Sequence, residues 1–412
     1  MSHTLESLRA EYQELRDRGL SLDLTRGKPS AAQLDLSAGL LDLDLSDDYR
    51  DGAGTDLRNY GGTDGVTELR EIFGDLLGIP ASQLLAGNNA SLTTMHDVIA
   101  HALLHGVAGG EPWYGKDIVF LCPAPGYDRH FAITQSFGIR MVSIPYLEDG
   151  SLDLVSIRAH LADSHVRGMW VVPLYANPTG SSIDEATARA LAAMPAAASD
   201  FRIFWDNAYA VHHLTDDEPA PLDILGIAAE EGHPDRFFVF ASTSKITHAG
   251  AGVAFFASSA ANLAWYRKHS SVQTIGPDKL NHWRHARFFG DADGVREHMR
   301  KHRALLAPKF ALVDRILTER LAGHASWTTP TGGYFVTLWA PARTASRAVE
   351  LAKSAGIAVT PAGAAYPYGD DPHDSVIRIA PSMPTEADLA VAIDALALCV
   401  LLAEAELAVS GR

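Results

Sequence analysis

Short apolar runs alternate with stretches of helical periodicity along most of the chain. The runs that are long enough to form strands cover residues 118–121, 140–144, 169–174, 202–205, 237–240 and 252–256. Helical patterns at 184–194 and 221–229 lie between some of these runs. Apolar strands that alternate with helices are typical of a mostly parallel sheet with helices on both faces. We therefore expect an α/β fold whose ligand binds beyond the carboxyl ends of the strands.

A smaller α+β unit is predicted in the last part of the chain. Its expected elements are, in order, a long helix at 291–322, a strand at 334–338, a helix at 344–355, a strand at 376–379 and a closing helix from 385. An amphipathic N-terminal helix is expected to pack on this unit, because apolar residues recur at helical spacing at Leu5, Leu8, Tyr12 and Leu15. The expected parts are therefore an N-terminal segment at 1–48, a large domain at 49–300 and a small domain at 301–412.

The composition narrows the classes of function. The 412 residues are 47% hydrophobic and 20% charged, which is typical of a folded chain with a large core. Asp and Glu number 50 against 34 Lys and Arg, and this net charge of −16 argues against a nucleic-acid partner, which needs a basic surface. Residues 1–20 lack the apolar core of a signal peptide, and no apolar run approaches the length of a membrane span. We therefore expect a cytoplasmic protein with no membrane partner.

Disulfide and metal chemistry are not expected. The two cysteines, Cys122 and Cys399, each lie in an apolar stretch, which favours buried free thiols over a disulfide or a zinc site. The adjacent His212 and His213 would point to opposite faces of a strand, which is a poor geometry for one metal ion. No His-Glu-x-x-His pattern occurs in the sequence either.

Reactive side chains follow the ends of the predicted strands. Lys245 comes after the strand at 237–240, and a lysine that is partly desolvated there has a lowered pKa and can form a Schiff base. Asp206 closes the strand at 202–205, where a carboxylate needs a cationic partner such as a protonated ring nitrogen; Tyr209 follows with a hydroxyl. Taken alone, each residue leaves a simpler alternative open, a surface lysine or a helix-capping aspartate.

Other strand ends add groups for the same ligand. Asn177 lies in a tight turn after a strand, and Tyr127 follows another strand, where its ring can stack on a planar ligand. Arg378 lies inside an apolar strand and needs an anion, for which a substrate carboxylate is the natural partner. A helix with small and hydroxyl residues at its start can bind a phosphate; these residues are Ser91, Leu92 and Thr93. The set describes a site for a flat, cationic, phosphorylated aldehyde.

These residues resemble those of class I aminotransferases with the type I fold of pyridoxal-phosphate enzymes, over nearly the whole chain. The most specific motifs are Asn177-Pro178-Thr179-Gly180, Asp206-x-x-Tyr209, Ser242-x-x-Lys245 and the late Arg378. Residues 24–29, 58–62 and 244–256 are similar to the bacterial subgroup Ic aspartate aminotransferases, often labelled MocR-type. Because no winged helix precedes these motifs, we do not expect a DNA-binding regulator.

The resemblance implies the cofactor pyridoxal 5'-phosphate and a role for each residue of the site. Lys245 would hold the cofactor through a Schiff base and move the proton in catalysis, while Asp206 keeps the ring nitrogen protonated. Asn177 and Tyr209 would donate hydrogen bonds to the 3'-oxygen of the ring, and Tyr127 would stack on the ring. The phosphate would be received by Ser91, the Leu92 backbone, Thr93 and Ser242.

The resemblance further implies the substrates and a homodimer with active sites at the subunit interface. Arg378 would bind the α-carboxylate of amino-acid and 2-oxo-acid substrates, and Gly27 would pass close to it. Tyr60 would reach the phosphate in the neighbouring subunit. The expected reaction is a ping-pong transamination between L-aspartate and 2-oxoglutarate, which needs a second cation for the side-chain carboxylate. The candidates are Arg26, Lys28 and Arg284.

One departure from the class pattern and two alternatives remain. The class has a phosphate-binding arginine shortly after the lysine, but residues 249–253 contain none. We expect its charge to be replaced by one of His248, Lys279, Arg284 and Arg287. A transaminase for alanine or aromatic amino acids, or a lyase with the same cofactor, would share Lys245. A catalytically idle regulator is less favoured, because a mere binder needs no proton shuttle.

Overall fold

Within residues 4–411, which the computed structural model describes, the largest element is a seven-stranded sheet in the order β2-β8-β7-β6-β5-β3-β4. Its strands are β2 (Leu84–Ala86), β3 (Val119–Ala124), β4 (Arg140–Pro145), β5 (Val166–Val171), β6 (Arg202–Asp206), β7 (Phe237–Ser242) and β8 (Ala254–Ala257). The strands from β4 to β7 run parallel, and β8 is antiparallel to both of its neighbours. The expected α/β fold with a mostly parallel sheet is confirmed.

The alternation of side chains along the central strands supplies two cores. Ile203 and Trp205 of β6 point to one face of the sheet, and Phe204 points to the other. The first face is covered by α3 (Thr67–Leu77), α6 (Leu154–His160), α7 (Glu185–Ala193), α8 (Ile224–Glu230) and α10 (Lys279–Phe289). The second face is covered by α4 (Ser91–His105), α5 (Asp128–Ser136) and α9 (Ala260–Ser270). Burial on both faces explains the nearly continuous apolar sequence of these strands.

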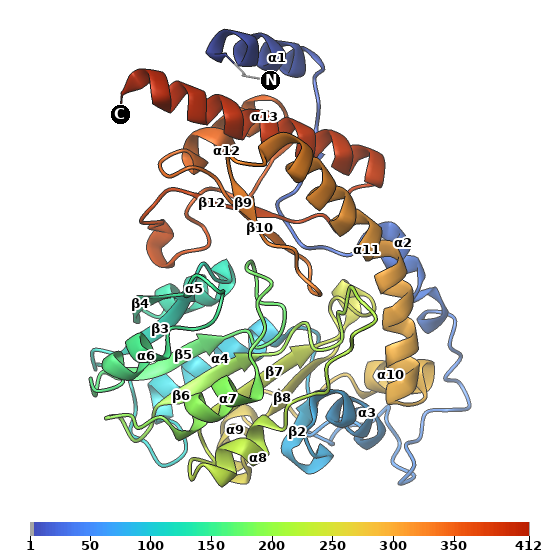
Figure 1. Ribbon diagram of the computed structural model, residues 1–412. Helices are drawn as coiled ribbons and strands as arrows, with labels where there is room; N and C mark the ends of the chain where they lie inside the picture. The colour runs from blue at the N-terminus through green and yellow to red at the C-terminus, as the bar shows by residue number, and fades with distance from the viewer. Residues whose placement is uncertain (1–3, 412) are drawn as a thin grey trace.

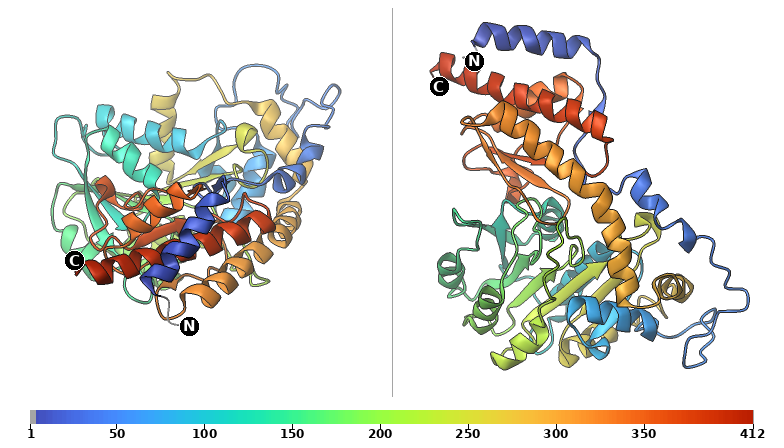
Figure 2. Two further views of the ribbon diagram at one scale, coloured as in Figure 1. Left: turned by 90° about the horizontal axis from the view of Figure 1, so that it is seen from above. Right: turned by 45° about the vertical axis from the view of Figure 1, so that its right-hand side comes forward.

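A second sheet of three antiparallel strands lies above the first in Figure 1, in the order β12-β10-β9. This unit contains β9 (Ser326–Trp327), β10 (Val336–Trp339), α12 (Ala345–Ser354), β12 (Val376–Ile379) and α13 (Glu386–Ser410). The long helix α11 (Ala292–Leu321) runs from the large sheet to this unit, as both Figure 1 and Figure 2 show.

The N-terminal segment also packs on the second unit. The predicted N-terminal helix is α1 (Leu5–Asp17), which lies against α13 and buries Leu8 and Leu15 in the same core; residues 1–3 lie outside the described residues. Farther along, β1 (Leu22–Asp23) pairs in parallel with β11 (Ile357–Ala358), and α2 (Ala31–Asp35) follows. These pairings bring residues 25–28 between the two units, where the candidate site lies.

Some element bounds differ from those predicted. β5 ends at Val171 although the apolar pattern continues to residue 174, because Pro173 has no N–H to donate to a strand ladder. β8 begins at Ala254 rather than at residue 252, and β2 was not predicted because it has only three residues. Cys122 and Cys399 are buried free thiols, as expected. Among the described residues, no helix has both the length and the apolar character needed to cross a membrane.

Candidate active site

A cavity of about 500 Å³ lies where the strand ends of the large sheet face the second unit. It brings together many of the residues that the sequence placed in one site, namely Arg26, Gly27, Tyr127, Asn177, Tyr209, Lys245 and Arg378. The lining also includes Lys28, a predicted candidate for the second cation, together with Thr25, Asp128, Arg129, Phe335, Thr360 and Pro361. The cavity therefore lies beyond the carboxyl ends of the parallel strands, as expected for this fold.

Lys245 lies three residues beyond β7 and is partly buried. Its Nζ lies 5.0 Å from the centre of the Tyr209 ring. Desolvation lowers the pKa of the Lys245 ammonium, although the nearby charge of Asp206 acts in the opposite direction. Because a lower pKa increases the neutral amine fraction, Lys245 is suited to act as a nucleophile and a base.

The carboxylate of Asp206 is buried at the end of β6 with one oxygen paired and the other unpaired. Nε2 of His130 lies 2.9 Å from Oδ2, and the His130 ring stacks on Trp170 with 4.2 Å between ring centres. Oδ1 has no hydrogen-bond partner among the described residues. A buried carboxylate oxygen normally has a donor. The protonated ring nitrogen of pyridoxal phosphate fits this requirement.

Two tyrosines keep their protons in the cavity. Burial raises the pKa of Tyr127 to about 12, and it raises the pKa of Tyr209 well above its ordinary value. Tyr127 immediately precedes α5, and Tyr209 follows β6 by three residues. Both phenols can therefore donate hydrogen bonds at neutral pH. The amide of Asn177, also buried, accepts a hydrogen bond of 3.4 Å from Nη1 of Arg378.

Arg378 reaches the cavity from β12 of the second sheet. Its side chain is 8% exposed, and Nη1 donates to Oδ1 of Asp128 at 2.8 Å. Nη2 donates to Oγ1 of Thr360 at 3.2 Å, and the guanidinium carbon lies 5.1 Å from the centre of the Phe335 ring. Gly27 passes close to the Cζ end of that ring, since a Cβ at this position would lie 2.6 Å from Cζ of Phe335. The close approach explains why the chain has glycine here.

The start of α4 and the end of β7 lie beside each other outside the lining of this cavity. Within residues 4–411, no side chain caps α4, so its first N–H groups can face an anion. Oγ of Ser242 donates to Oγ of Ser244 at 3.1 Å. A Cβ at Gly252 would lie 3.4 Å from the Ser244 nitrogen and 3.5 Å from the Asn89 oxygen, so the two loops are adjacent. This donor set, with Ser91, Leu92 and Thr93 at the helix start, fits a phosphate.

Tyr60 does not line the cavity of its own chain and is 84% exposed. The loop that carries it is fixed by Lys279, whose ammonium donates to the Asn59 oxygen at 2.6 Å and to the Gly61 oxygen. Two carbonyl acceptors therefore engage this lysine, which leaves it poorly placed to replace the phosphate-binding arginine.

The other basic residues that we considered as replacements for the phosphate-binding arginine have different surroundings. Arg287 pairs with Asp48 at 2.8 Å, so its charge is also used elsewhere. Arg284 is exposed on α10 and does not line the cavity of its own chain. His248 remains near the site, because it precedes the short turn at Ala249–Ala251 after Lys245.

Sequence reasoning missed several groups that hold the site together. His130 could have been found from its spacing, three residues after Tyr127 at the start of a helix. The backbone oxygen of Lys245 lies 3.3 Å from Nε2 of His212 and accepts a bond of 3.4 Å from the Tyr334 hydroxyl. The Ile246 oxygen lies 2.9 Å from Nε2 of a buried histidine of α11, His298. No sequence signal identifies such acceptors, because every residue has a carbonyl group.

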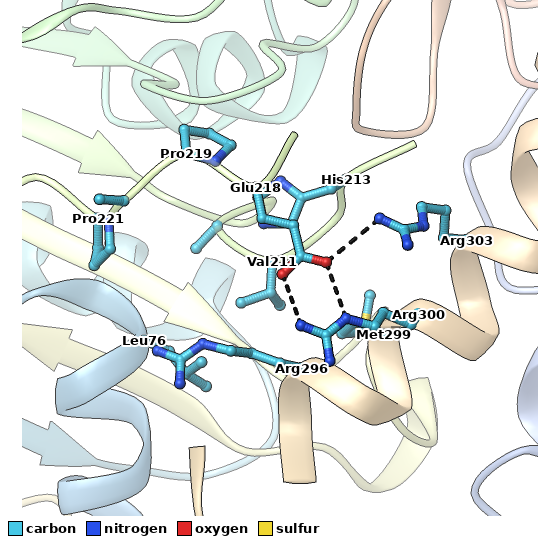
Figure 3. Close-up of a pocket in the computed structure, with 12 residues that line it drawn as sticks. Leu76, Val211, His213, Glu218, Pro219, Pro221, Arg296, Met299, Arg300 and Arg303 are labelled. Carbon is cyan, nitrogen blue, oxygen red and sulfur yellow. Dashed lines mark hydrogen bonds and ion pairs between the residues drawn. The ribbon is translucent and has the colours of Figure 1, made fainter. Parts of the chain in front are cut away.

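A second cavity, of about 270 Å³, lies beside α11 (Figure 3). Three arginines face it, but acidic side chains already pair with them. Glu218 pairs with Arg300 at 3.2 Å and with Arg303 at 3.4 Å, as the dashed lines in Figure 3 show. Arg296 pairs with Asp293 at 2.7 Å. We therefore assign no anion-binding role to this cavity.

The two adjacent histidines have separate partners. Nε2 of His212 faces the Lys245 oxygen, whereas Nδ1 of His213 lies 2.7 Å from the Tyr175 hydroxyl. Among the described residues, no group of three or more His, Cys, Asp or Glu side chains could hold a metal ion.

Solved structures with similar folds define the class of protein. A crystal structure of an aspartate transaminase from Corynebacterium glutamicum superposes with a TM-score of 0.95, at 51% identity, over 98% of this chain and 96% of that one. An α-aminoadipate aminotransferase from Thermus thermophilus, complexed with N-(5'-phosphopyridoxyl)-L-leucine, superposes with a TM-score of 0.75 at 19% identity, covering 95% of each chain. The chain is an aminotransferase with the type I fold of pyridoxal-phosphate-dependent transferases.

The particular family follows from the sequence. The family model described as aspartate amino-transferase matches residues 1–411, and the chain belongs to this family. A relative named as a putative aminotransferase of Mycolicibacterium smegmatis is 58% identical over 402 residues, which are 96% of this chain and 94% of that protein.

Proposed function

We propose that this protein is a pyridoxal-phosphate-dependent aspartate aminotransferase of subgroup Ic that moves an amino group between L-aspartate and 2-oxoglutarate. The observation that carries the proposal is the convergence of the Lys245 amine, with its lowered pKa, and the Arg378 guanidinium on one cavity. The buried carboxylate of Asp206, which has an unpaired oxygen, lies near enough to Lys245 to influence its pKa. The 51% identity to the aspartate transaminase of Corynebacterium glutamicum supports the same substrate class.

The residues present fit pyridoxal phosphate. When bound, this cofactor supplies a conjugated ring that delocalises the electrons left on the substrate α-carbon. Oδ1 of Asp206 would accept a hydrogen bond from the ring nitrogen, and the Tyr209 hydroxyl and Asn177 amide would bond the ring oxygen. Tyr127 would cover one face of the ring. The phosphate would be held by Ser91, Leu92, Thr93 and Ser242.

Lys245 would move the proton of the reaction. Its Nζ would take the proton from the substrate α-carbon and return it to the cofactor carbon that receives the amino group, which is general acid–base catalysis by one residue. The lowered pKa of Lys245 serves this step, because a base with a pKa nearer to neutrality accepts and returns a proton more readily.

The charges of the cavity favour a dicarboxylate substrate over alanine or an aromatic amino acid. Arg378 would bind the α-carboxylate, while Arg26, Lys28 and Arg129 line the same cavity and can meet a second carboxylate. Alanine would leave these cations without a partner. Of the cations considered in the sequence, Arg26 and Lys28 therefore remain candidates, and Arg129 joins them.

A homodimer belongs to the same proposal. Tyr60 is exposed and its loop is fixed by Lys279, which supports a role at the site of a neighbouring subunit. Sedimentation velocity would give the mass of the assembly, and inactive Y60F and K245A variants that regain activity on mixing would indicate shared sites. We also propose that the chain divides into parts at 1–48, 49–300 and 301–412, which limited proteolysis would test. A cytoplasmic location is a further proposal, which cell fractionation would test.

The decisive experiment is the visible absorbance of the protein with pyridoxal phosphate. We expect a yellow band that fades when L-aspartate is added and returns with 2-oxoglutarate. The K245R variant keeps the charge but should show neither the band nor the cofactor mass on its peptide after borohydride reduction, whereas the control K268R should behave like the parent. A band that ignores aspartate but responds to alanine would reject the proposed substrate.

A further inference from the structure

The guanidinium that would bind the substrate α-carboxylate already contacts a carboxylate of its own chain. Oδ1 of Asp128 accepts from Nη1 of Arg378 at 2.8 Å, and Oδ1 of Asn177 accepts from the same nitrogen at 3.4 Å. Nη2 donates to Thr360 at 3.2 Å. Asp128 is the first residue of α5 and lines the cavity.

The contacts of Arg378 with Asp128 and Asn177 compete with a ligand for the hydrogens of the guanidinium. A guanidinium Nη carries two hydrogens, and a carboxylate that binds end-on across Nη1 and Nη2 needs one from each. Nη2 still has one hydrogen free, but Asp128 and Asn177 use both hydrogens of Nη1. Nε has no hydrogen-bond partner among the described residues, but it is buried. A substrate carboxylate that binds end-on across Nη1 and Nη2 therefore needs one of these two acceptors to leave.

Asp128 is the acceptor that can leave at the lower cost. Its side chain is 34% exposed, whereas Asn177 is buried. A released Asp128 would face water and would still lie in the first turn of α5, where a negative charge is favoured by the helix dipole. A released Asn177 would lose a hydrogen bond in a buried position, which is more costly.

We propose that Asp128 is an internal competitor for Arg378 that sets the affinity of this enzyme for carboxylate substrates. The inference rests on the proposed role of Arg378 in binding the α-carboxylate. Every carboxylate ligand displaces the same group, so Asp128 weakens monocarboxylates and dicarboxylates by the same factor. The opposite role, in which Asp128 orients Arg378 for the ligand, predicts weaker binding once Asp128 is removed.

The test measures binding of two non-reacting acids, maleate and propionate, by calorimetry on the D128N and D128A variants, with and without pyridoxal phosphate. We expect both acids to bind roughly three- to thirtyfold more tightly to each variant, the range for losing a partly exposed ion pair to a buried arginine. D117N removes a carboxylate that pairs with Arg140 on the surface, and it should leave both affinities unchanged. Equal or weaker binding to D128N and D128A, or tighter binding of maleate alone, would overturn the inference.

This experiment separates the inference from the proposed function. Maleate and propionate binding requires no turnover, so it reports on Asp128 even if the parent protein ignores L-aspartate. In that case tighter binding to the Asp128 variants would support the competitor role, while the proposed aspartate reaction would be rejected. The kinetic counterpart in an active enzyme is a lower KM for aspartate in D128N at a similar kcat.

Discussion

Replacing His130 with phenylalanine isolates the hydrogen bond that holds Asp206. The ring of His130 lies nearly parallel to Trp170, at an angle of 6°, and phenylalanine can keep this stacking. It removes the N–H that meets Oδ2 of Asp206 at 2.9 Å, and the other oxygen of Asp206 has no partner among the described residues. In the cofactor-free H130F variant, the buried carboxylate would therefore have no donor at all.

The loss is large because one partner is charged. A hydrogen bond to a charged group contributes about 1.5–3 kcal/mol net, and a buried group left unpaired adds its desolvation cost. We expect the free energy of unfolding of cofactor-free H130F, measured by urea denaturation, to fall by about 2–3 kcal/mol. In a D206N background the same change should cost about 1 kcal/mol, since the acceptor is then neutral.

The difference between the two backgrounds is the coupling energy of the pair. Circular dichroism and fluorescence transitions that coincide would show that the free energies are comparable. If His130→Phe costs the same with Asp206 and with Asn at position 206, within about 0.5 kcal/mol, the hydrogen bond does not hold the carboxylate, and the reasoning fails.

Three further changes test other parts of the site. G27A places a Cβ 2.6 Å from the Phe335 ring under the Arg378 guanidinium, so we expect weaker maleate binding by calorimetry, and an unchanged affinity would contradict the close approach. K245M should raise the melting temperature of the cofactor-free protein at pH 7, because the folded state holds the Lys245 proton less tightly than the unfolded state does. This gain in melting temperature should vanish above about pH 10.4, where lysine is neutral in both states. Burial holds the pKa of His302 to about 4, so the unfolded state binds more protons between pH 4 and the ordinary histidine value, and stability falls on acidification through this window. Urea denaturation at several pH values gives the free energy of unfolding as a function of pH. In this window its slope should be smaller for H302Q than for the parent protein, by up to about 1.4 kcal/mol per pH unit, and an unchanged slope would mean that His302 does not titrate there.

Much of the site was predictable because parallel strands end at one edge of a sheet. Asp206 ends β6, and Asn177 and Lys245 follow β5 and β7, so their convergence follows from strand order alone. Arg378 was predictable for a different reason, since an arginine inside an apolar strand must find an anion. The identity of that anion in the ligand-free chain could not be predicted, because Asp128 is 250 residues away in sequence and only the packing of the two units brings it near.

Burial, rather than residue type alone, decides which histidine and lysine side chains of the site carry a positive charge. Desolvation lowers the pKa of His212 far below its ordinary value and that of His302 to about 4, so the imidazoles behind the lysine turn are neutral and act as hydrogen-bonding groups. Lys245 itself has a lowered pKa for the same reason and not because cations crowd it. Arginine does not lose its proton in this way. Guanidinium groups such as those of Arg26 and Arg378 therefore supply permanent positive charge in the cavity, which can attract carboxylates while Lys245 remains available as a base. A substrate that brings negative charge close to Lys245 would raise the pKa of the lysine, so the distance between the carboxylate-binding arginines and Nζ governs how well one cavity can serve both binding and proton transfer.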